Sequence, residues 1–102
     1  FTYIKDLCNG VLLSIENTKA TNEIFNLTYG GSRTINNLKD ILLEHFPKAK
    51  IAYEKRDKLM PKRGTLSINK AKNLLNYKPS FSIEQAYPEY IRWYKEFLDN
   101  NI

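Results

Sequence analysis

The run of residues 63–79 constrains the fold more than any other stretch, because it sets both ends of a short helix. The first residues of this run have the pattern of an extended segment, and Asn69 is placed to cap the helix that follows. Asn76 suits a left-handed C-cap, since Asn is the non-glycine residue that best tolerates that conformation. Pro79 then prevents the helix from continuing. The run predicts a short strand, a compact helix and a tight turn, in that order.

Hydrophobic spacing predicts three further helices. Apolar side chains recur at helical intervals over residues 4–16, over 35–46 and again over 83–98. Thr34 is a natural N-cap for the second of these helices, and Ser82 opens a capping box for the third. At strict helical spacing, the apolar stripe of the first helix and the aromatic stripe of the last are expected to face the core.

Two more segments have the pattern of strands. Residues 24–29 alternate apolar and polar side chains, and residues 50–54 form a second short extended run. Together with the extended start at 65–68, they alternate with helices along the chain. Such an order is typical of an α/β fold. We therefore expect a small α+β-like domain in which short, mostly parallel strands are covered by about four helices.

The composition narrows the class of protein. A chain of 102 residues forms one domain at most, and its 42% hydrophobic content is enough for a core. No apolar run approaches the ~20 residues that span a bilayer, and the first residues lack the features of a signal peptide. Cys8 is the one cysteine, which fits a reducing cytoplasm, and its place on an apolar helix face predicts burial. His45 is the one histidine and has no second ligand nearby, so no metal site is expected.

The charge is unevenly distributed. Sixteen Lys and Arg stand against eleven Asp and Glu, and the excess is concentrated between Lys48 and Lys78. Three interpretations are open: a surface for a polyanion such as nucleic acid, a solvated lysine-rich face, and a pocket for a small phosphorylated ligand. Nucleic acid is disfavoured, because the aromatic residues fall on predicted core stripes and no known nucleic-acid-binding motif occurs.

Five segments, taken in order, resemble the C-terminal region of the extended short-chain dehydrogenase/reductases. These are the NAD-dependent nucleotide-sugar epimerases and dehydratases, of the UDP-glucose 4-epimerase kind. The segments are Phe1-Thr-Tyr-Ile-Lys-Asp6, Ile24-Phe-Asn-Leu-Thr-Tyr-Gly-Gly31, Ser67-Ile-Asn-Lys-Ala-Lys72, Leu75-Asn-Tyr-Lys-Pro79 and the closing helix from Ser82 to Tyr94. No single segment is specific for the family, and the resemblance rests on all five occurring in the family's order. We interpret residues 1–102 as the C-terminal substrate-binding region of such an enzyme, a fragment that lacks the Rossmann domain.

The resemblance implies that cofactor binding and catalysis belong to other parts of the enzyme. The family's glycine-rich loop has no counterpart, since the spacing around Gly30 and Gly31 fails. Its tyrosine-x-x-x-lysine pair is absent too, because Tyr90 and Lys95 are five positions apart. NAD is expected for the full-length protein, whereas residues 1–102 are expected to supply no cofactor site, metal site or catalytic residue. The expected partners are the nucleotide-sugar substrate and the missing Rossmann domain, and the chain alone is expected to be inactive.

The resemblance also assigns two arginines to substrate binding. Arg56 falls where the family places an arginine on the nucleotide diphosphate, and a guanidinium can fork two hydrogen bonds onto one phosphate. Arg63 falls at a pocket-side position, where a ligand contact and a structural role are both open. Leu59 replaces an acidic residue that meets the ribose in the family, and Asp57 is the candidate replacement.

Two other functions are open from the sequence: a stand-alone basic module for nucleic acid, and a protein-interaction domain. Removal of a Rossmann domain would uncover apolar surface. Self-association is therefore expected, through the helix over residues 4–16 or the residues just before it.

Overall fold

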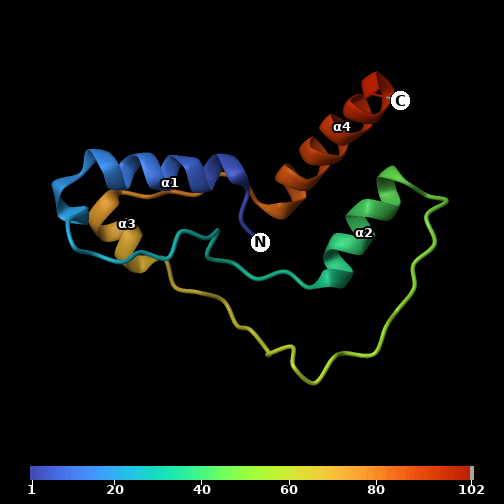
Figure 1. The fold of residues 1–102 in the computed structure, drawn as a ribbon, viewed down its shortest axis with the longest axis horizontal. Helices are drawn as coiled ribbons and strands as arrows, with labels where there is room; N and C mark the ends of the chain where they lie inside the picture. The colour runs from blue at the N-terminus through green and yellow to red at the C-terminus, as the bar shows by residue number, and fades with distance from the viewer. Residues whose placement is uncertain (102) are drawn as a thin grey trace.

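Residues 1–101 fold into four α-helices joined by long extended segments, as Figure 1 shows. The computed structural model describes residues 1–101. Helix α1 spans Ile4–Glu16, α2 spans Ile35–His45, α3 spans Asn69–Leu75, α4 spans Ile83–Asn101, and a 3₁₀ turn, η1, spans Thr18–Ala20. The helices form two groups, because α1 and α3 pack together beside η1, while α2 packs against α4.

The expected α/β fold is wrong, because residues 1–101 contain helices and no β-strand. The segments with strand-like patterns, 24–29, 50–54 and 65–68, have no backbone ladder. Segments 24–29 and 65–68 do lie side by side, since the Asn26 side-chain amide donates to the carbonyl oxygen of Ser67 at 3.2 Å. Alternating apolar residues make a strand only when a neighbouring strand supplies backbone partners. Within the described residues no segment does so.

The core lies between α1 and α3, with Tyr77 at its centre. Tyr77 is fully buried, and its hydroxyl donates to the carbonyl oxygen of Thr28 at 3.1 Å, so its one polar atom is satisfied. Gly10 of α1 passes over this ring, and a Cβ added there would stand 3.1 Å from the ring. The absence of a side chain at Gly10 thus lets α1 approach. The surrounding apolar side chains are Leu13, Ala20, Phe25, Leu27, Ile68, Ala71 and Leu75.

Helix α3 ends as the sequence predicts. Asn76 is left-handed with φ 54°, and the N–H of Tyr77 donates to the carbonyl oxygen of Ala71 at 3.2 Å. This turn brings Tyr77 back onto the core. The predicted start is wrong, because Asn69 is the first helical residue rather than the cap. The hydroxyl of Ser67 accepts from the N–H of Asn69 at 3.3 Å.

A buried carboxylate joins α1 to the segment that leads into α4. Asp6 is 4% exposed, and its two oxygens accept hydrogen bonds from the backbone N–H groups of Ser80 at 2.8 Å and Phe81 at 2.9 Å. The ring of Phe81 also packs on Tyr3, with a centroid distance of 4.9 Å. The two helix groups are therefore connected by a specific polar contact as well as by apolar packing.

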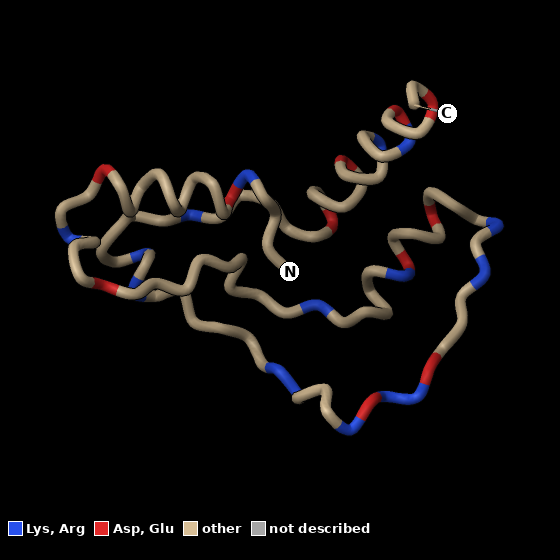
Figure 2. The backbone as a smooth tube through the Cα atoms, viewed as in Figure 1, with Lys and Arg blue, Asp and Glu red and all other residues tan. Residues whose placement is uncertain are grey.

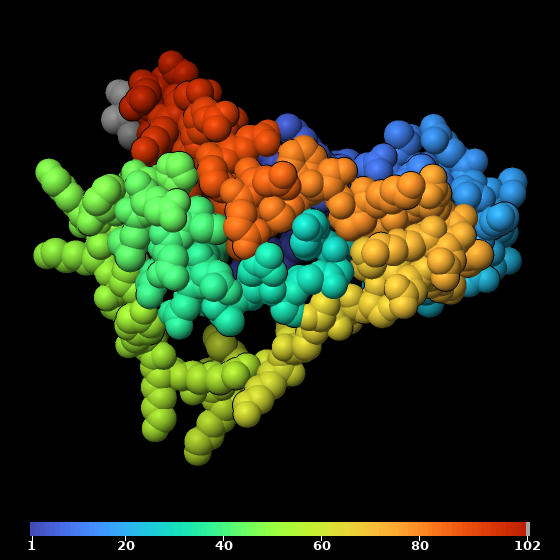
Figure 3. Space-filling model, turned by 180° about the vertical axis from the view of Figure 1, so that it is seen from behind, coloured from blue at the N-terminus to red at the C-terminus, as the bar shows by residue number. Residues whose placement is uncertain are grey.

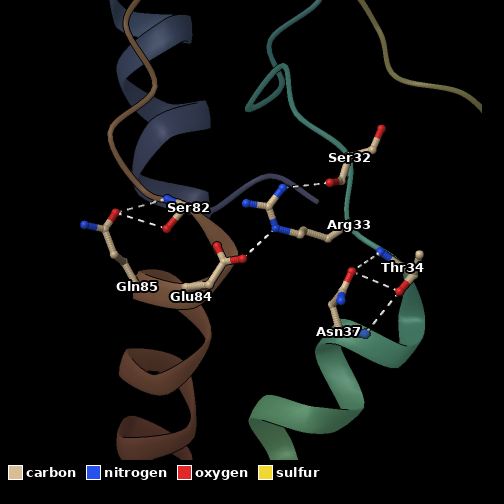
Figure 4. Close-up of polar contacts among 7 residues, drawn as sticks. All are labelled: Ser32, Arg33, Thr34, Asn37, Ser82, Glu84 and Gln85. Atoms are coloured by element: carbon tan, nitrogen blue, oxygen red, sulfur yellow. Dashed lines mark hydrogen bonds and ion pairs between the residues drawn. The ribbon is translucent and has the colours of Figure 1, made fainter.

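The beginnings of α2 and α4 face each other (Figure 4). Thr34 opens α2 with a complete capping box, which confirms the predicted N-cap. At the start of α4, the N–H of Ser82 donates to Oε1 of Gln85 at 3.2 Å, which is one half of the predicted box. Arg33, directly before the first cap, forms an ion pair with Glu84, with 2.5 Å between Nε and Oε1. This ion pair joins the start of α2 to the start of α4.

The chain exposes more surface than a compact protein of its mass. Its accessible surface is 8399 Å², against about 6,000 Å² for a folded monomer of 12.0 kDa. Its radius of gyration is 16.9 Å, against about 13 Å for a compact domain of this length. The space-filling view in Figure 3 shows the yellow-green segment, in the middle of the chain, standing clear of the body.

Two expectations about burial are also wrong. Cys8 is exposed, because α1 turns Asp6 and Gly10 inward and most of its apolar side chains outward. These exposed side chains, which together with Cys8 we call the aliphatic stripe, are Ile4, Leu7, Val11, Leu12 and Ile15. In α4 the buried residues are Ala86 and Ile91, whereas aromatic residues predicted for the core are about half exposed.

Candidate functional site

Residues 48–63, which we call the basic arc, form the outer edge of the molecule in Figure 2. They contain seven Lys and Arg and two acidic residues, an excess equal to the net charge of +5 of the whole chain. Residues 50–63 are exposed throughout. The basic arc is therefore an accessible, positively charged surface that favours anions.

A tight turn shapes the middle of the basic arc. The N–H of Met60 donates to the carbonyl oxygen of Asp57 at 3.2 Å, and the Asp57 carboxylate accepts from the N–H of Leu59 at 2.9 Å. Across this turn, Nη2 of Arg56 donates to the carbonyl oxygen of Pro61 at 2.8 Å. A guanidinium carries five N–H donors, so this contact leaves donors for a ligand.

Among the surface hollows of the described residues, two have walls suited to a ligand. The aromatic hollow, of about 370 Å³, lies where the N-terminal residues meet α2 and α4, and its walls include Phe1, Tyr3, Leu38, Phe81, Tyr87 and Tyr90. The lysine hollow, of about 360 Å³, is lined by Tyr29, Gly30, Gly31, Lys72, Lys78 and Pro79. Arg56 and Arg63 line neither hollow; both are exposed on the basic arc.

The lysine hollow unites residues that no sequence motif connects. Lys72 comes from α3 and Lys78 from the turn after it, whereas Gly30 comes from the segment before α2. Gly30 has φ 81°, and its N–H donates to Oγ1 of Thr28 at 3.2 Å. Two lysine residues lining the same hollow as this turn suit an anionic group. The glycine pair was the only signal in the sequence, and its position beside α3 depends on the fold.

Lys5 stands at the rim of the aromatic hollow. Its Nζ lies 2.6 Å from Oε1 of Glu89 and 5.8 and 5.6 Å from the ring centroids of Tyr3 and Phe81. The hydrogen bond to Glu89 raises the pKa of Lys5, and burial, with Glu89, raises the pKa of the Tyr3 hydroxyl. Both shifts favour the protonated forms, and the hollow presents aromatic rings to an apolar or aromatic ligand.

The described residues offer little else for chemistry. Within residues 1–101, no group of three or more His, Cys, Asp or Glu side chains could hold a metal ion. In the same part of the chain, no helix is both long enough and apolar enough to cross a membrane.

Two curated relatives align with almost the whole of this chain. It is 36% identical over 103 residues to the UDP-glucuronate 4-epimerase of Thermodesulfobacterium geofontis (strain OPF15), which covers 97% of this chain and 31% of that protein. It is 30% identical over 118 residues to UDP-glucuronate 4-epimerase 1 of Arabidopsis thaliana, which covers 99% of this chain and 27% of that protein. The chain is similar to nucleotide-sugar epimerases. No family model matches the sequence, and no solved structure matches it.

This similarity confirms, at the level of a nucleotide-sugar epimerase, the resemblance carried by the five sequence segments. The chain spans less than a third of the length of either relative. The aligned region is therefore one part of each of those proteins.

Proposed function

We propose that this chain is the substrate-binding portion of an NAD-dependent nucleotide-sugar epimerase, with UDP-glucuronate as the substrate to test first. The supporting observation is the 36% identity to a UDP-glucuronate 4-epimerase over 97% of the chain. In such an enzyme NAD supplies the hydride acceptor and donor that inversion of a sugar carbon requires.

We infer that NAD binds outside residues 1–101. A dinucleotide site needs a glycine-rich loop that leaves a strand and enters a helix N-terminus. The described chain has no strand, and the N–H of Gly30 is already bonded to the Thr28 side chain. We therefore assign the cofactor and the chemical step to the rest of the enzyme, and substrate binding to this chain.

The basic arc supplies the charge that a nucleotide diphosphate requires. Arg56 and Arg63 are both exposed on it, and each can place two N–H donors on one phosphate. Arg56 would exchange its bond to Pro61 for bonds to the ligand, which are stronger because both partners are charged. Binding that anchors the nucleotide would hold the sugar in position for reaction elsewhere in the protein.

The aliphatic stripe of α1 supports a second part of the proposal, docking onto a Rossmann domain. The side chains of the stripe are 38–76% exposed, and the largest value belongs to Ile15. Exposed aliphatic side chains gathered on one face of a helix are typical of surfaces that another part of a protein covers. Because the two relatives are more than three times as long as the aligned region, they contain additional chain that could cover such a stripe.

Titration of the chain with UDP-glucuronate, followed by NMR chemical shifts, tests substrate binding. We expect saturable binding that Arg56→Ala weakens about tenfold or more, because a charge-assisted hydrogen bond is lost. Lys48→Ala is the matched control, since it removes one positive charge from the end of the basic arc without touching either assigned arginine. Equal binding by both variants would show that charge alone, not Arg56, holds the ligand.

The basic arc also favours a second candidate, non-specific binding of nucleic acid. An oligonucleotide titrated at several salt concentrations distinguishes the two functions. Saturable oligonucleotide binding that survives about 0.2 M salt, without saturable binding of UDP-glucuronate, would favour nucleic acid. Weak retention that disappears with salt is the result expected from the proposed function.

A further inference from the structure

Five aromatic rings stack along one face of α4. We call Tyr87, Tyr90, Trp93, Tyr94 and Phe97 the aromatic ladder. The centroid distances are 6.5 Å for Tyr87–Tyr90, 5.7 Å for Tyr90–Trp93, 6.4 Å for Tyr90–Tyr94 and 5.6 Å for Trp93–Phe97. The last four residues are 41–54% exposed. Because each ring is supported by its neighbours, the ladder is an ordered surface rather than a set of free side chains.

The aromatic ladder differs in chemistry from the aliphatic stripe of α1. The stripe contains Ile, Leu and Val, which are typical of an interior. The ladder contains Tyr, Trp and Phe and is bordered by the charged residues Glu89 and Glu96. An aromatic centre with a charged rim is the composition of protein–protein contacts, in which Trp and Tyr commonly carry most of the binding energy.

The rim of the ladder is complementary to itself in one orientation. Glu89 and Glu96 are seven residues apart, about two helical turns, and so they lie on the same edge of α4. Lys5 joins this edge at Glu89, with 2.6 Å between Nζ and Oε1. Along α4, this edge therefore carries first Glu89 with its bound Lys5, and then the acidic Glu96.

We propose that α4 pairs antiparallel with α4 of a second copy of this chain, about a two-fold axis beside Trp93. In antiparallel helices the same edges meet, so an axis midway between Glu89 and Glu96 brings Lys5 of each copy to Glu96 of the other. Trp93 then lies within about one residue of its own equivalent, beside the axis. A parallel pair would instead place this edge of one copy against the opposite edge of the other, so Lys5 would not meet Glu96.

The exposed area of the aromatic ladder limits how strongly two copies can associate. An aromatic side chain carries about 150–250 Å², and the four ladder residues that are nearly half exposed therefore offer on the order of 400 Å² per copy. Two copies would bury about 800 Å², which is typical of a weak, reversible dimer. The inference is independent of the proposed substrate, because it rests on α4 and Lys5 rather than on the basic arc.

Sedimentation equilibrium over about 10 µM to 1 mM chain tests the proposal. The unmodified chain is expected to be a monomer at the low end and a dimer at the high end. Trp93→Glu is expected to weaken association at least tenfold, since it places a charge at the centre of the contact. Val11→Glu, which places the same charge on the exposed aliphatic stripe, is expected to leave the dimer unchanged. Monomer at every concentration, or a dimer sensitive to Val11→Glu and not to Trp93→Glu, would overturn the proposal.

Zero-length cross-linking tests the orientation. A carbodiimide joins an amine to an adjacent carboxylate, so Lys5–Glu89 links are expected within one copy. In a mixture of ¹⁵N-labelled and unlabelled chains, Lys5–Glu96 links are expected to carry one labelled and one unlabelled peptide. A dimer whose mixed-isotope links join other residues, with no Lys5–Glu96 link among them, would contradict antiparallel pairing. Circular dichroism confirms that each variant retains its helices before the comparison is made.

Discussion

Asp6 and Phe81 are joined by a hydrogen bond of 2.9 Å, from the backbone N–H of Phe81 to Oδ2 of the buried carboxylate. The other carboxylate oxygen accepts from the N–H of Ser80 at 2.8 Å. One side chain near the start of α1 thus satisfies two consecutive backbone donors just before α4. This contact fixes the corner at which the aromatic hollow is built, because Phe81 lines that hollow together with Tyr3.

Asp6→Asn is expected to destabilise the chain by about 1–3 kcal/mol, because an amide presents one acceptor where the carboxylate presents two. One backbone N–H would then face the amide N–H₂ group. Urea unfolding followed by circular dichroism measures the free energy of unfolding. Asp99→Asn, an exposed change of the same chemistry in α4, is the control and should be close to neutral. Equal effects of the two substitutions would show that the Asp6 contact does not carry stability.

Gly10→Ala is expected to destabilise the chain despite the better helix propensity of Ala. The new Cβ would stand 2.9 Å from two methyl carbons of Leu27 and 3.1 Å from the ring of fully buried Tyr77. Overpacking of this kind typically costs about 1–3 kcal/mol, which outweighs a propensity gain of about 1 kcal/mol. Thermal unfolding measures the balance. Gly64→Ala is the matched control, because nothing lies within 4 Å of its Cβ position. A raised melting temperature for Gly10→Ala would show that α1 can shift away from the core.

Helix boundaries were predictable because they depend on local chemistry. The capping box at Thr34, the left-handed Asn76 and the turn before Pro79 all follow from residues within a few positions of each other. Asn69 shows the limit of such reasoning, since a capping residue type at the right place became the first residue of α3 instead. The N-cap is Ile68, whose side chain makes no capping bond, and the N–H of Asn69 donates to the hydroxyl of Ser67 instead.

Strands and buried faces were not predictable because they depend on distant partners. Residues 24–29 have strand alternation, but a strand also needs a neighbour, and residues 65–68 contribute only a side-chain contact. Periodicity likewise identified the apolar face of α1 without revealing that Asp6 and Gly10, on the opposite face, are the buried ones. The reason lies more than sixty residues away in the sequence. The N–H of Phe81 donates to the carboxylate of Asp6, and the ring of Tyr77 packs where Gly10 has no side chain.

The candidate site shows the same difference between features set by local sequence and features set by the fold. Arg56 and Arg63 were selected by position in a resemblance, and both lie exposed on the basic arc, where their role as ligand contacts stays a prediction. Lys72 and Lys78 were not selected, because only the fold brings them to the Gly30 turn. Charge density along the sequence thus indicated the basic arc, whereas the lysine hollow is assembled from three segments and had only its glycine pair as a sequence signal.

The hydroxyl of Tyr77 should make stability sensitive to alkaline pH. Burial, with a smaller contribution from the charge of Asp6, raises the pKa of Tyr77 above its usual value of 10.0. Its contribution is therefore fully present below about pH 10 and is lost as the pH rises towards the folded value, since the unfolded state releases the proton first. Tyr77→Phe should flatten this alkaline decline and cost about 1 kcal/mol at neutral pH through loss of the bond to Thr28. Urea unfolding between about pH 7 and pH 11 measures both effects. Tyr94→Phe, at a half-exposed position, is the control and should leave the decline intact.

The ion pair between Arg33 and Glu84 should act in the opposite pH range. The hydrogen bond from Arg33 lowers the pKa of Glu84 from its usual 4.5, so the folded state favours the charged carboxylate. That contribution is present above about pH 4.5 and is lost as the pH falls through the lowered folded value, because the unfolded state takes up the proton first. Glu84→Gln should therefore reduce the melting temperature slightly at about pH 7 and have no effect at about pH 2. Both side chains are substantially exposed, so about 0.5 M salt should also remove the difference. Glu16→Gln, at an exposed position in α1, is the control. A melting difference for Glu84→Gln that persists at low pH and in high salt would show that packing of the side chain, and not its charge, connects α4 to the segment before α2.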